Sequence, residues 1–96
     1  MNSPELDHNV IEKIASICAG EDDAVTLMAV IAVELYQSVD GFDWVGFYRV
    51  AMPGTLKLGP YQGGHGCLLI PFDKGVCGAA ARYRQTQIVD DVSQFD

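Results

Sequence analysis

The stretch Trp44-Val45-Gly46-Phe47-Tyr48-Arg49-Val50 decides the fold, because its side chains alternate between two faces. Successive residues of a strand point to opposite sides, so one face carries Trp44, Gly46, Tyr48 and Val50. Met52-Pro53-Gly54-Thr55 follows, with proline and glycine in the central positions of a type II turn. Leu56-Lys57-Leu58-Gly59 then returns as a second strand, and together these segments predict an antiparallel hairpin.

Two helices are predicted before the hairpin. Ser3 and Pro4 suit the N-cap and the first position of a helix. Apolar residues then recur at three and four as far as Cys18, which predicts an amphipathic helix of about 15 residues that ends at Gly20. The acidic turn Glu21-Asp22-Asp23 suits the positive N-terminal end of a second helix. That helix is apolar on nearly every face from Val25 to Leu35, so we expect it to be buried on more than one side.

The remaining elements follow the hairpin. The glycine-rich residues 61–66 predict a flexible segment, and Cys67-Leu68-Leu69-Ile70-Pro71 predicts a short buried strand. Residues 76–85 predict a helix opened by Gly75, and Gln87-Ile88-Val89 predicts a last strand that leaves an open sheet edge. The order helix, helix, strand, strand, strand, helix, strand predicts one α+β domain with a mainly antiparallel sheet and the helix pair packed on one face.

Composition narrows the function classes. The 96 residues carry a net charge of −7, and residues 1–48 hold nine carboxylates against one lysine. A pI near 4.5 argues against binding to a phosphate backbone, so no nucleic acid is expected as a partner. The most apolar stretch, Ala24 to Val33, is about half of the ~20 residues that a membrane span needs. We therefore expect a cytoplasmic protein with reduced thiols and no membrane partner.

Trp44 and Tyr48 are the first candidate binding residues. They share a strand face with Gly46 between them, so their rings are expected to flank a gap about 7 Å wide, at ~3.4 Å per residue. A small apolar or thioether-like group would fit there, held by ring faces and sulfur–aromatic contacts. Ordinary core packing explains the same pattern, because aromatic residues are common in strands.

Cys67 and Cys77 are the candidate redox residues. Cys77 falls in the first turn of the predicted helix, where free amide donors and the helix dipole favour a thiolate. The C-x9-C spacing fits neither a zinc knuckle nor a thioredoxin-type pair. The alternative interpretation is that both residues are small buried hydrophobes. Cys18, on the apolar stripe of the first helix, is interpreted as structural, and no metal site is predicted.

Polar residues near these cysteines give weaker signals. His65 is either a proton donor or base, or an exposed loop histidine without a carboxylate to orient it. The run Gly63-Gly64-His65-Gly66 lacks the lysine and hydroxyl residue of a phosphate-binding loop. The scattered basic residues are predicted to be solvated, namely Lys57, Lys74, Arg82 and Arg84.

Several motifs together resemble a known family. They are Asp43-Trp44-Val45-Gly46-Phe47-Tyr48, Leu58-Gly59-Pro60-Tyr61-Gln62-Gly63, Cys67-Leu68-Leu69-Ile70-Pro71, Gly75-Val76-Cys77-Gly78-Ala79-Ala80 and Gln87-Ile88-Val89-Asp90-Asp91-Val92 with Phe95-Asp96. In order and spacing these motifs resemble the free methionine-R-sulfoxide reductases, which are GAF-fold enzymes, over roughly residues 21–96. The resemblance implies a GAF-like fold in a single domain, residues 1–96, with a helical layer at 1–38 and the sheet and redox loops at 42–96.

The resemblance also implies a reaction. In the family a cysteine thiolate attacks the sulfoxide sulfur of free methionine-R-sulfoxide, methionine leaves, and a sulfenic acid remains. A second cysteine captures it as a disulfide, which thioredoxin reduces, so no bound cofactor is needed. Cys67 and Cys77 match two of the three redox cysteines, and Trp44 and Tyr48 match the aromatic pocket that receives the substrate. A homodimer through the N-terminal helices is implied as well.

One departure from the family limits these implications. The third cysteine, usually the attacking one, follows the segment that matches Phe95-Asp96, and the 96 residues do not include it. We therefore expect a GAF domain truncated at its C-terminal end that does not turn over substrate alone. Two alternatives stay open: a GAF module that senses a small ligand or dimerises without catalysis, and a structural fragment that folds on another chain.

Overall fold

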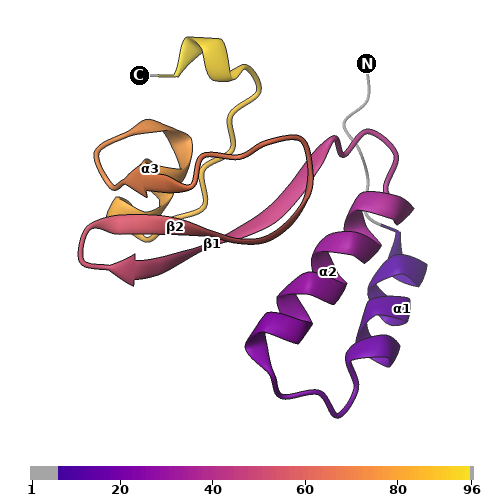
Figure 1. Cartoon of the computed structure of the whole chain (residues 1–96). Helices are drawn as coiled ribbons and strands as arrows, with labels where there is room; N and C mark the ends of the chain where they lie inside the picture. Colours follow the sequence, from indigo (N-terminus) through magenta and orange to yellow (C-terminus); the bar gives the residue numbers. More distant parts are fainter. Residues whose placement is uncertain (1–6, 96) are drawn as a thin grey trace. The chain divides into compact units, whose positions relative to one another are not determined.

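The computed structural model describes residues 7–95 (Figure 1). The elements in chain order are α1 (His8–Cys18), α2 (Ala24–Ser38), β1 (Trp44–Met52), β2 (Thr55–Gly63), β3 (Leu69–Pro71), α3 (Gly75–Tyr83) and a short 3₁₀ turn, η1 (Val92–Gln94). The strands form one sheet in the order β1-β2-β3. Helices beside an antiparallel sheet confirm the predicted α+β class.

The chain divides into two compact units. The first unit holds the chain up to Phe47 together with Gly59–Gly66, and the second holds Tyr48–Leu58 and the chain from Cys67 onward. Each unit has a small core of its own. Ala32 and Val39 are buried in the first, and Leu56 and Ala79 in the second.

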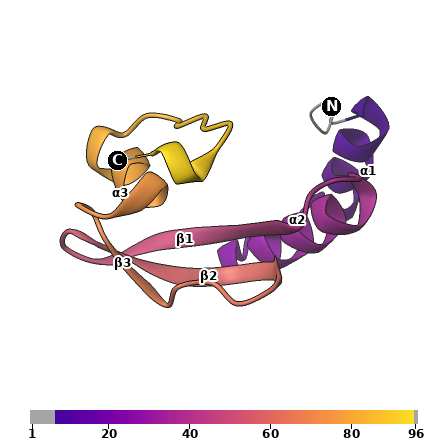
Figure 2. The same cartoon turned by 90° about the horizontal axis from the view of Figure 1, so that it is seen from above.

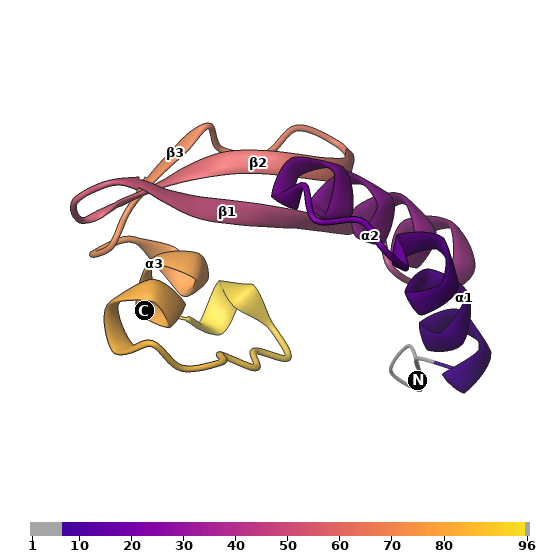
Figure 3. The same ribbon diagram turned by 90° about the horizontal axis from the view of Figure 1, so that it is seen from below.

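Helices α1 and α2 lie side by side in the first unit (Figures 1 and 3). The predicted helix start at Ser3 and Pro4 lies outside the described residues. In the structure α1 begins at His8, because the Asp7 carboxylate accepts the amide of Asn9 at 2.7 Å as an N-cap. The helix ends as expected, with Gly20 directly beyond it at φ +80°. An ion pair of 3.2 Å between Lys13 and Glu34 joins the two helices.

Helix α2 begins where the acidic turn predicted. The Asp23 carboxylate accepts the amides of Val25 and Thr26 at 2.9 and 3.2 Å, which satisfies two of the free donors of the first turn. The expectation of burial on more than one side is wrong for this chain. Ala32 is the buried residue of α2, and Val25 is 60% exposed.

The hairpin of β1 and β2 confirms the fold-deciding stretch, and Figure 2 shows the two strands side by side. Gly54 takes φ +69°, which the third position of a type II turn requires. The second strand is longer than predicted, since β2 continues through Pro60 to Gly63. The predicted flexible segment is wrong for residues 61–63, because they extend the hairpin.

Strand β3 pairs antiparallel with the start of β2, with Leu56 opposite Ile70 and Lys57 opposite Leu69. The predicted short strand therefore exists, but it is not buried. Leu68 and Leu69 are 73% and 52% exposed, because β3 lies at the edge of the sheet.

Helix α3 begins at Gly75, as predicted, and ends at Tyr83 with Arg84 in the left-handed region at φ 53°. The strand predicted at Gln87-Ile88-Val89 is wrong. These residues are irregular, and Ile88 is 89% exposed, so no ladder partner or core fixes them. Figure 3 shows the C-terminal part of the chain in yellow, including the short helical turn η1.

Candidate functional site

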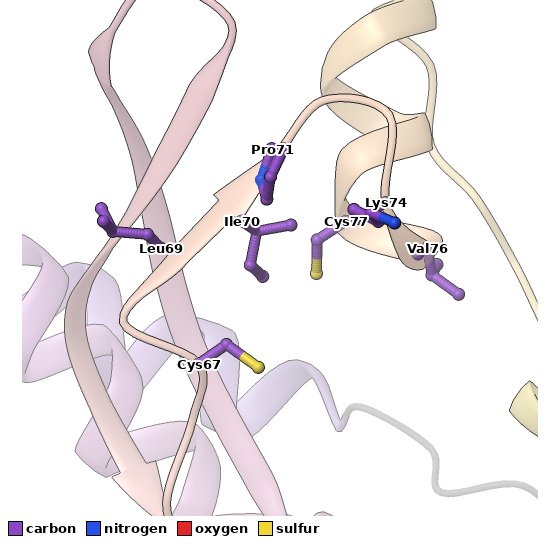
Figure 4. A pocket seen from close by; sticks show the side chains of 8 residues that line it. Cys67, Leu69, Ile70, Pro71, Lys74, Val76 and Cys77 are labelled. Atoms are coloured by element: carbon purple, nitrogen blue, oxygen red, sulfur yellow. The ribbon is translucent and has the colours of Figure 1, made fainter.

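Cys67 and Cys77 line one pocket of the second unit. Its volume is about 390 Å³, and its walls come from β3, the residues before it and the first turn of α3. Figure 4 shows both sulfur atoms turned toward the same open space. Both cysteines are free thiols and exposed, so the reading of them as buried hydrophobes is wrong. The remaining lining residues are Leu69, Ile70, Pro71, Lys74, Gly75 and Val76.

Close packing of α3 positions Cys77. A Cβ atom on Gly78 would lie 2.7 Å from the Pro71 carbonyl oxygen and 2.9 Å from that of Phe72, so glycine lets the helix meet the turn after β3. The Arg82 guanidinium donates a hydrogen bond to the Phe72 carbonyl, again from α3 to this turn. Arg82 is exposed, as predicted, and its guanidinium also contacts the backbone of this turn.

The backbone at Cys67 is held by two hydrogen bonds around it. The Tyr48 hydroxyl donates to the Cys67 carbonyl at 2.8 Å, and the Leu58 amide donates to the Leu68 carbonyl at 2.9 Å. Tyr48 is thus connected to one of the predicted redox cysteines. The sequence singled out Tyr48 for its ring, whereas its hydroxyl makes this connection.

Trp44 belongs to the first unit and does not line the pocket. Its indole stacks on Tyr61 with ring centroids 5.5 Å apart and an interplanar angle of 19°, and its Nε1 donates to the Gly64 carbonyl at 3.1 Å. A Cβ atom on Gly46 would lie 2.5 Å from the Trp44 ring and from Tyr61. The expected gap over Gly46 is therefore filled by the indole itself.

Tyr61 was missed by sequence reasoning, because residues 61–66 were interpreted as a flexible segment. Apolar and polar residues do not alternate between Gly59 and Gly63, so the sequence carried no period-of-two signal for this part of β2. Gly63 also gives Trp44 its space, since a Cβ there would lie 2.9 Å from the Trp44 ring and 2.7 Å from the Asp43 carbonyl oxygen. With φ +123°, the position requires glycine.

The other candidates lie elsewhere. His65 is exposed, and Cys18 is half-buried on α1. Among residues 7–95 no three His, Cys, Asp or Glu side chains gather closely enough to hold a metal ion. No helix within the same range is both long and apolar enough to cross a membrane.

Near the end of the chain, hydrogen bonds from the Ser93 hydroxyl and amide lower the pKa of the Asp91 carboxyl.

No family model matches the chain. Free methionine-R-sulfoxide reductase of Escherichia coli (strain K12) is 35% identical over 96 residues, which is the whole of this chain and 58% of that protein. The chain therefore spans less than two thirds of the length of this relative.

Solved structures agree with the sequence comparison. A structure of fRMsr (free methionine-R-sulfoxide reductase) of Staphylococcus aureus in complex with substrate matches 99% of this chain and 63% of its own, at 33% identity and a TM-score of 0.87. A GAF sensor protein from Burkholderia vietnamiensis matches 91% of this chain and 54% of its own, at 39% identity and a TM-score of 0.83. The chain thus has the GAF fold and is related over its whole length to the free methionine-R-sulfoxide reductases.

Proposed function

We propose that the chain is part of a reductase that converts free methionine-R-sulfoxide to methionine. The observation that carries this proposal is the shared pocket, in which two free thiols face the same space. The names of the E. coli relative and of the substrate-bound S. aureus structure support the substrate.

The proposed chemistry divides between cysteines. The attacking thiol attacks the sulfoxide sulfur, the sulfur–oxygen bond of the substrate breaks, and the oxygen ends on the cysteine. Methionine leaves, and the cysteine is now a sulfenic acid. A resolving thiol then displaces water and forms a disulfide, and thioredoxin reduces the disulfide by thiol exchange. The attacking cysteine implied by the family is not among the 96 residues, so we assign the resolving steps to Cys67 and Cys77.

The proposal also covers the substrate-binding residues, the cellular compartment and the oligomeric state. We propose a role in substrate binding for Tyr48, whose hydroxyl bonds to the Cys67 carbonyl. The same role for Trp44 rests on the family resemblance alone. We also propose that the protein works in the cytoplasm, where thioredoxin keeps its thiols reduced. A homodimer through the N-terminal helices would cover Ile11 and Ile17, which α1 leaves 46% and 48% exposed. Sedimentation of the 96-residue chain tests this part: a monomer at micromolar concentration would contradict it.

A chimera tests the function directly. Residues 1–96 would replace the matching part of the E. coli reductase, which supplies the rest of the domain. We expect the chimera to reduce free methionine-R-sulfoxide repeatedly with thioredoxin. With Cys67→Ser and Cys77→Ser together, we expect one turnover and then a persistent sulfenic acid, because no thiol of this segment captures it.

The control is Cys18→Ser, since Cys18 lies on α1 and does not line the pocket. It should leave thioredoxin-dependent turnover unchanged. A folded chimera that binds free methionine-R-sulfoxide but never reduces it would overturn the proposal. So would continued turnover in the double cysteine variant.

The second candidate is a non-catalytic GAF module, favoured by the similarity to the Burkholderia sensor. Thiol labelling of the 96-residue chain separates the two. The reductase predicts that Cys67 or Cys77 is alkylated readily below about pH 8, whereas a sensor predicts the rate of an ordinary exposed thiol.

A further inference from the structure

We propose that Cys67 and Cys77 form a two-coordinate site for a soft monovalent metal ion of the Cu(I) class. The proposal does not rest on the reductase function, because it needs only the pocket of the second unit. Two exposed thiols line this pocket and direct their sulfur atoms into one space (Figure 4).

The lining selects the kind of ion. Leu69, Ile70, Pro71 and Val76 offer apolar side chains, so no side-chain oxygen of the lining competes with sulfur. Soft ions such as Cu(I) prefer thiolates, whereas Mg²⁺ and Ca²⁺ need several oxygen ligands. In the described residues no third His, Cys, Asp or Glu joins the pair, which disfavours a four-coordinate zinc site.

Charge balance also favours a monovalent ion. Binding converts two thiols to thiolates and releases two protons, so Cu⁺ bound by both cysteines carries a net charge of −1. Lys74 lines the same pocket and supplies a compensating positive charge. The ion neither gains nor loses an electron, and hence the reaction requires no oxidant or reductant.

Anaerobic titration of the reduced 96-residue chain with Cu(I), held by a coloured chelator, tests the site. We expect the chain to withdraw one Cu(I) per molecule and to release two protons for each ion. Cys67→Ser and Cys77→Ser should each weaken the affinity by about 100-fold or more, since one thiolate cannot replace a pair. Cys18→Ser should bind as the parent chain does.

Two further measurements avoid reliance on serine variants. In the parent chain, bound Cu(I) should protect Cys67 and Cys77 from alkylation but leave Cys18 reactive. Lys74→Met should weaken binding, whereas Lys57→Met, which removes an exposed lysine of β2 outside the lining, should not.

The site is overturned by three results. They are binding that survives loss of Cys67 or Cys77, protection of one of these thiols without the other, and a complex in which the ion joins two chains. Native mass spectrometry detects the last result. Because the chimera assay measures turnover and this titration measures binding, failure of one is distinguishable from failure of the other.

Discussion

The Tyr48 hydroxyl holds the backbone of Cys67 by a hydrogen bond of 2.8 Å. Tyr48→Phe keeps the ring and removes this bond, so we expect the free energy of unfolding to fall by about 1 kcal/mol. Cys67 should also be alkylated faster relative to Cys77, because its segment loses a restraint. Urea unfolding and mass spectrometry of alkylated peptides measure both effects.

The matched control is Tyr83→Phe, since Tyr83 is a 61% exposed tyrosine of the same unit. Its hydroxyl makes no hydrogen bond with Cys67. An unchanged ratio of Cys67 to Cys77 alkylation in Tyr48→Phe would show that the bond does not position the thiol.

Replacing Trp44 tests whether its aromatic side chain binds the substrate. In the chimera, Trp44→Ala should weaken the binding of free methionine sulfoxide by about 1–3 kcal/mol, because an aromatic contact surface is lost. Calorimetric titration measures this change. Tyr61→Ala serves as the comparison, since it removes the stacking partner but keeps the indole. If Trp44→Ala leaves affinity intact, the residue serves packing over Gly46 and not the substrate.

At the scale of elements, Gly78 determines how α3 meets the turn after β3. Gly78→Ala would place a Cβ 2.7 Å from the Pro71 carbonyl oxygen, and overpacking of this kind costs about 1–3 kcal/mol. We therefore expect a lower midpoint in urea unfolding. Gly64→Ala is the control, because nothing lies within 4 Å of the added atom. Equal stability of the two variants would contradict the packing argument.

The turn η1 gives a pH-dependent prediction. Hydrogen bonds of 2.7 and 3.0 Å from the Ser93 hydroxyl and amide lower the pKa of Asp91 below its ordinary value of 3.8. A lowered folded-state pKa means that the ionised carboxylate stabilises the turn above pH 3.8, and this contribution is lost as the pH falls through the lowered value. NMR titration of the Asp91 carboxyl carbon should therefore give a midpoint below 3.8.

Ser93→Ala is the matched variant for this titration. It removes the hydroxyl bond, which is the larger cause of the shift, but keeps the amide bond. The Asp91 midpoint should move upward toward its ordinary value. An unchanged midpoint would mean that the hydroxyl does not stabilise the carboxylate.

At the scale of the whole molecule, the chain has little core for its size. The buried apolar residues of the described chain are Ala32, Val39, Leu56 and Ala79, and no large side chain among them is fully buried. We therefore expect the isolated chain to have a low free energy of unfolding.

Reductase activity is the second prediction at the scale of the whole molecule. We expect no turnover of free methionine-R-sulfoxide by the 96-residue chain in a thioredoxin-coupled assay, because the implied attacking cysteine is absent. The chimera is the positive control for the same assay. Turnover by the isolated chain would mean that Cys67 or Cys77 attacks the sulfoxide directly.

Local patterns explain which elements were predictable. The hairpin, the Asp23 cap and the start of α3 at Gly75 depend on residues a few positions apart, so periodicity and capping chemistry predict them. The extension of β2 to Gly63 and the exposure of β3 depend on neighbouring segments. Gln87-Ile88-Val89 has strand propensity, but no neighbouring strand pairs with it, so the strand does not form.

The sequence by itself determined the α+β class, the hairpin and the residues worth testing, namely Trp44, Tyr48, Cys67 and Cys77. Only the tertiary structure decided that both thiols line one pocket and that the indole of Trp44 fills the space over Gly46. The physical reason is distance along the chain. Stacking of Trp44 on Tyr61 and the bond from Tyr48 to Cys67 join residues that come together only once the strands have paired.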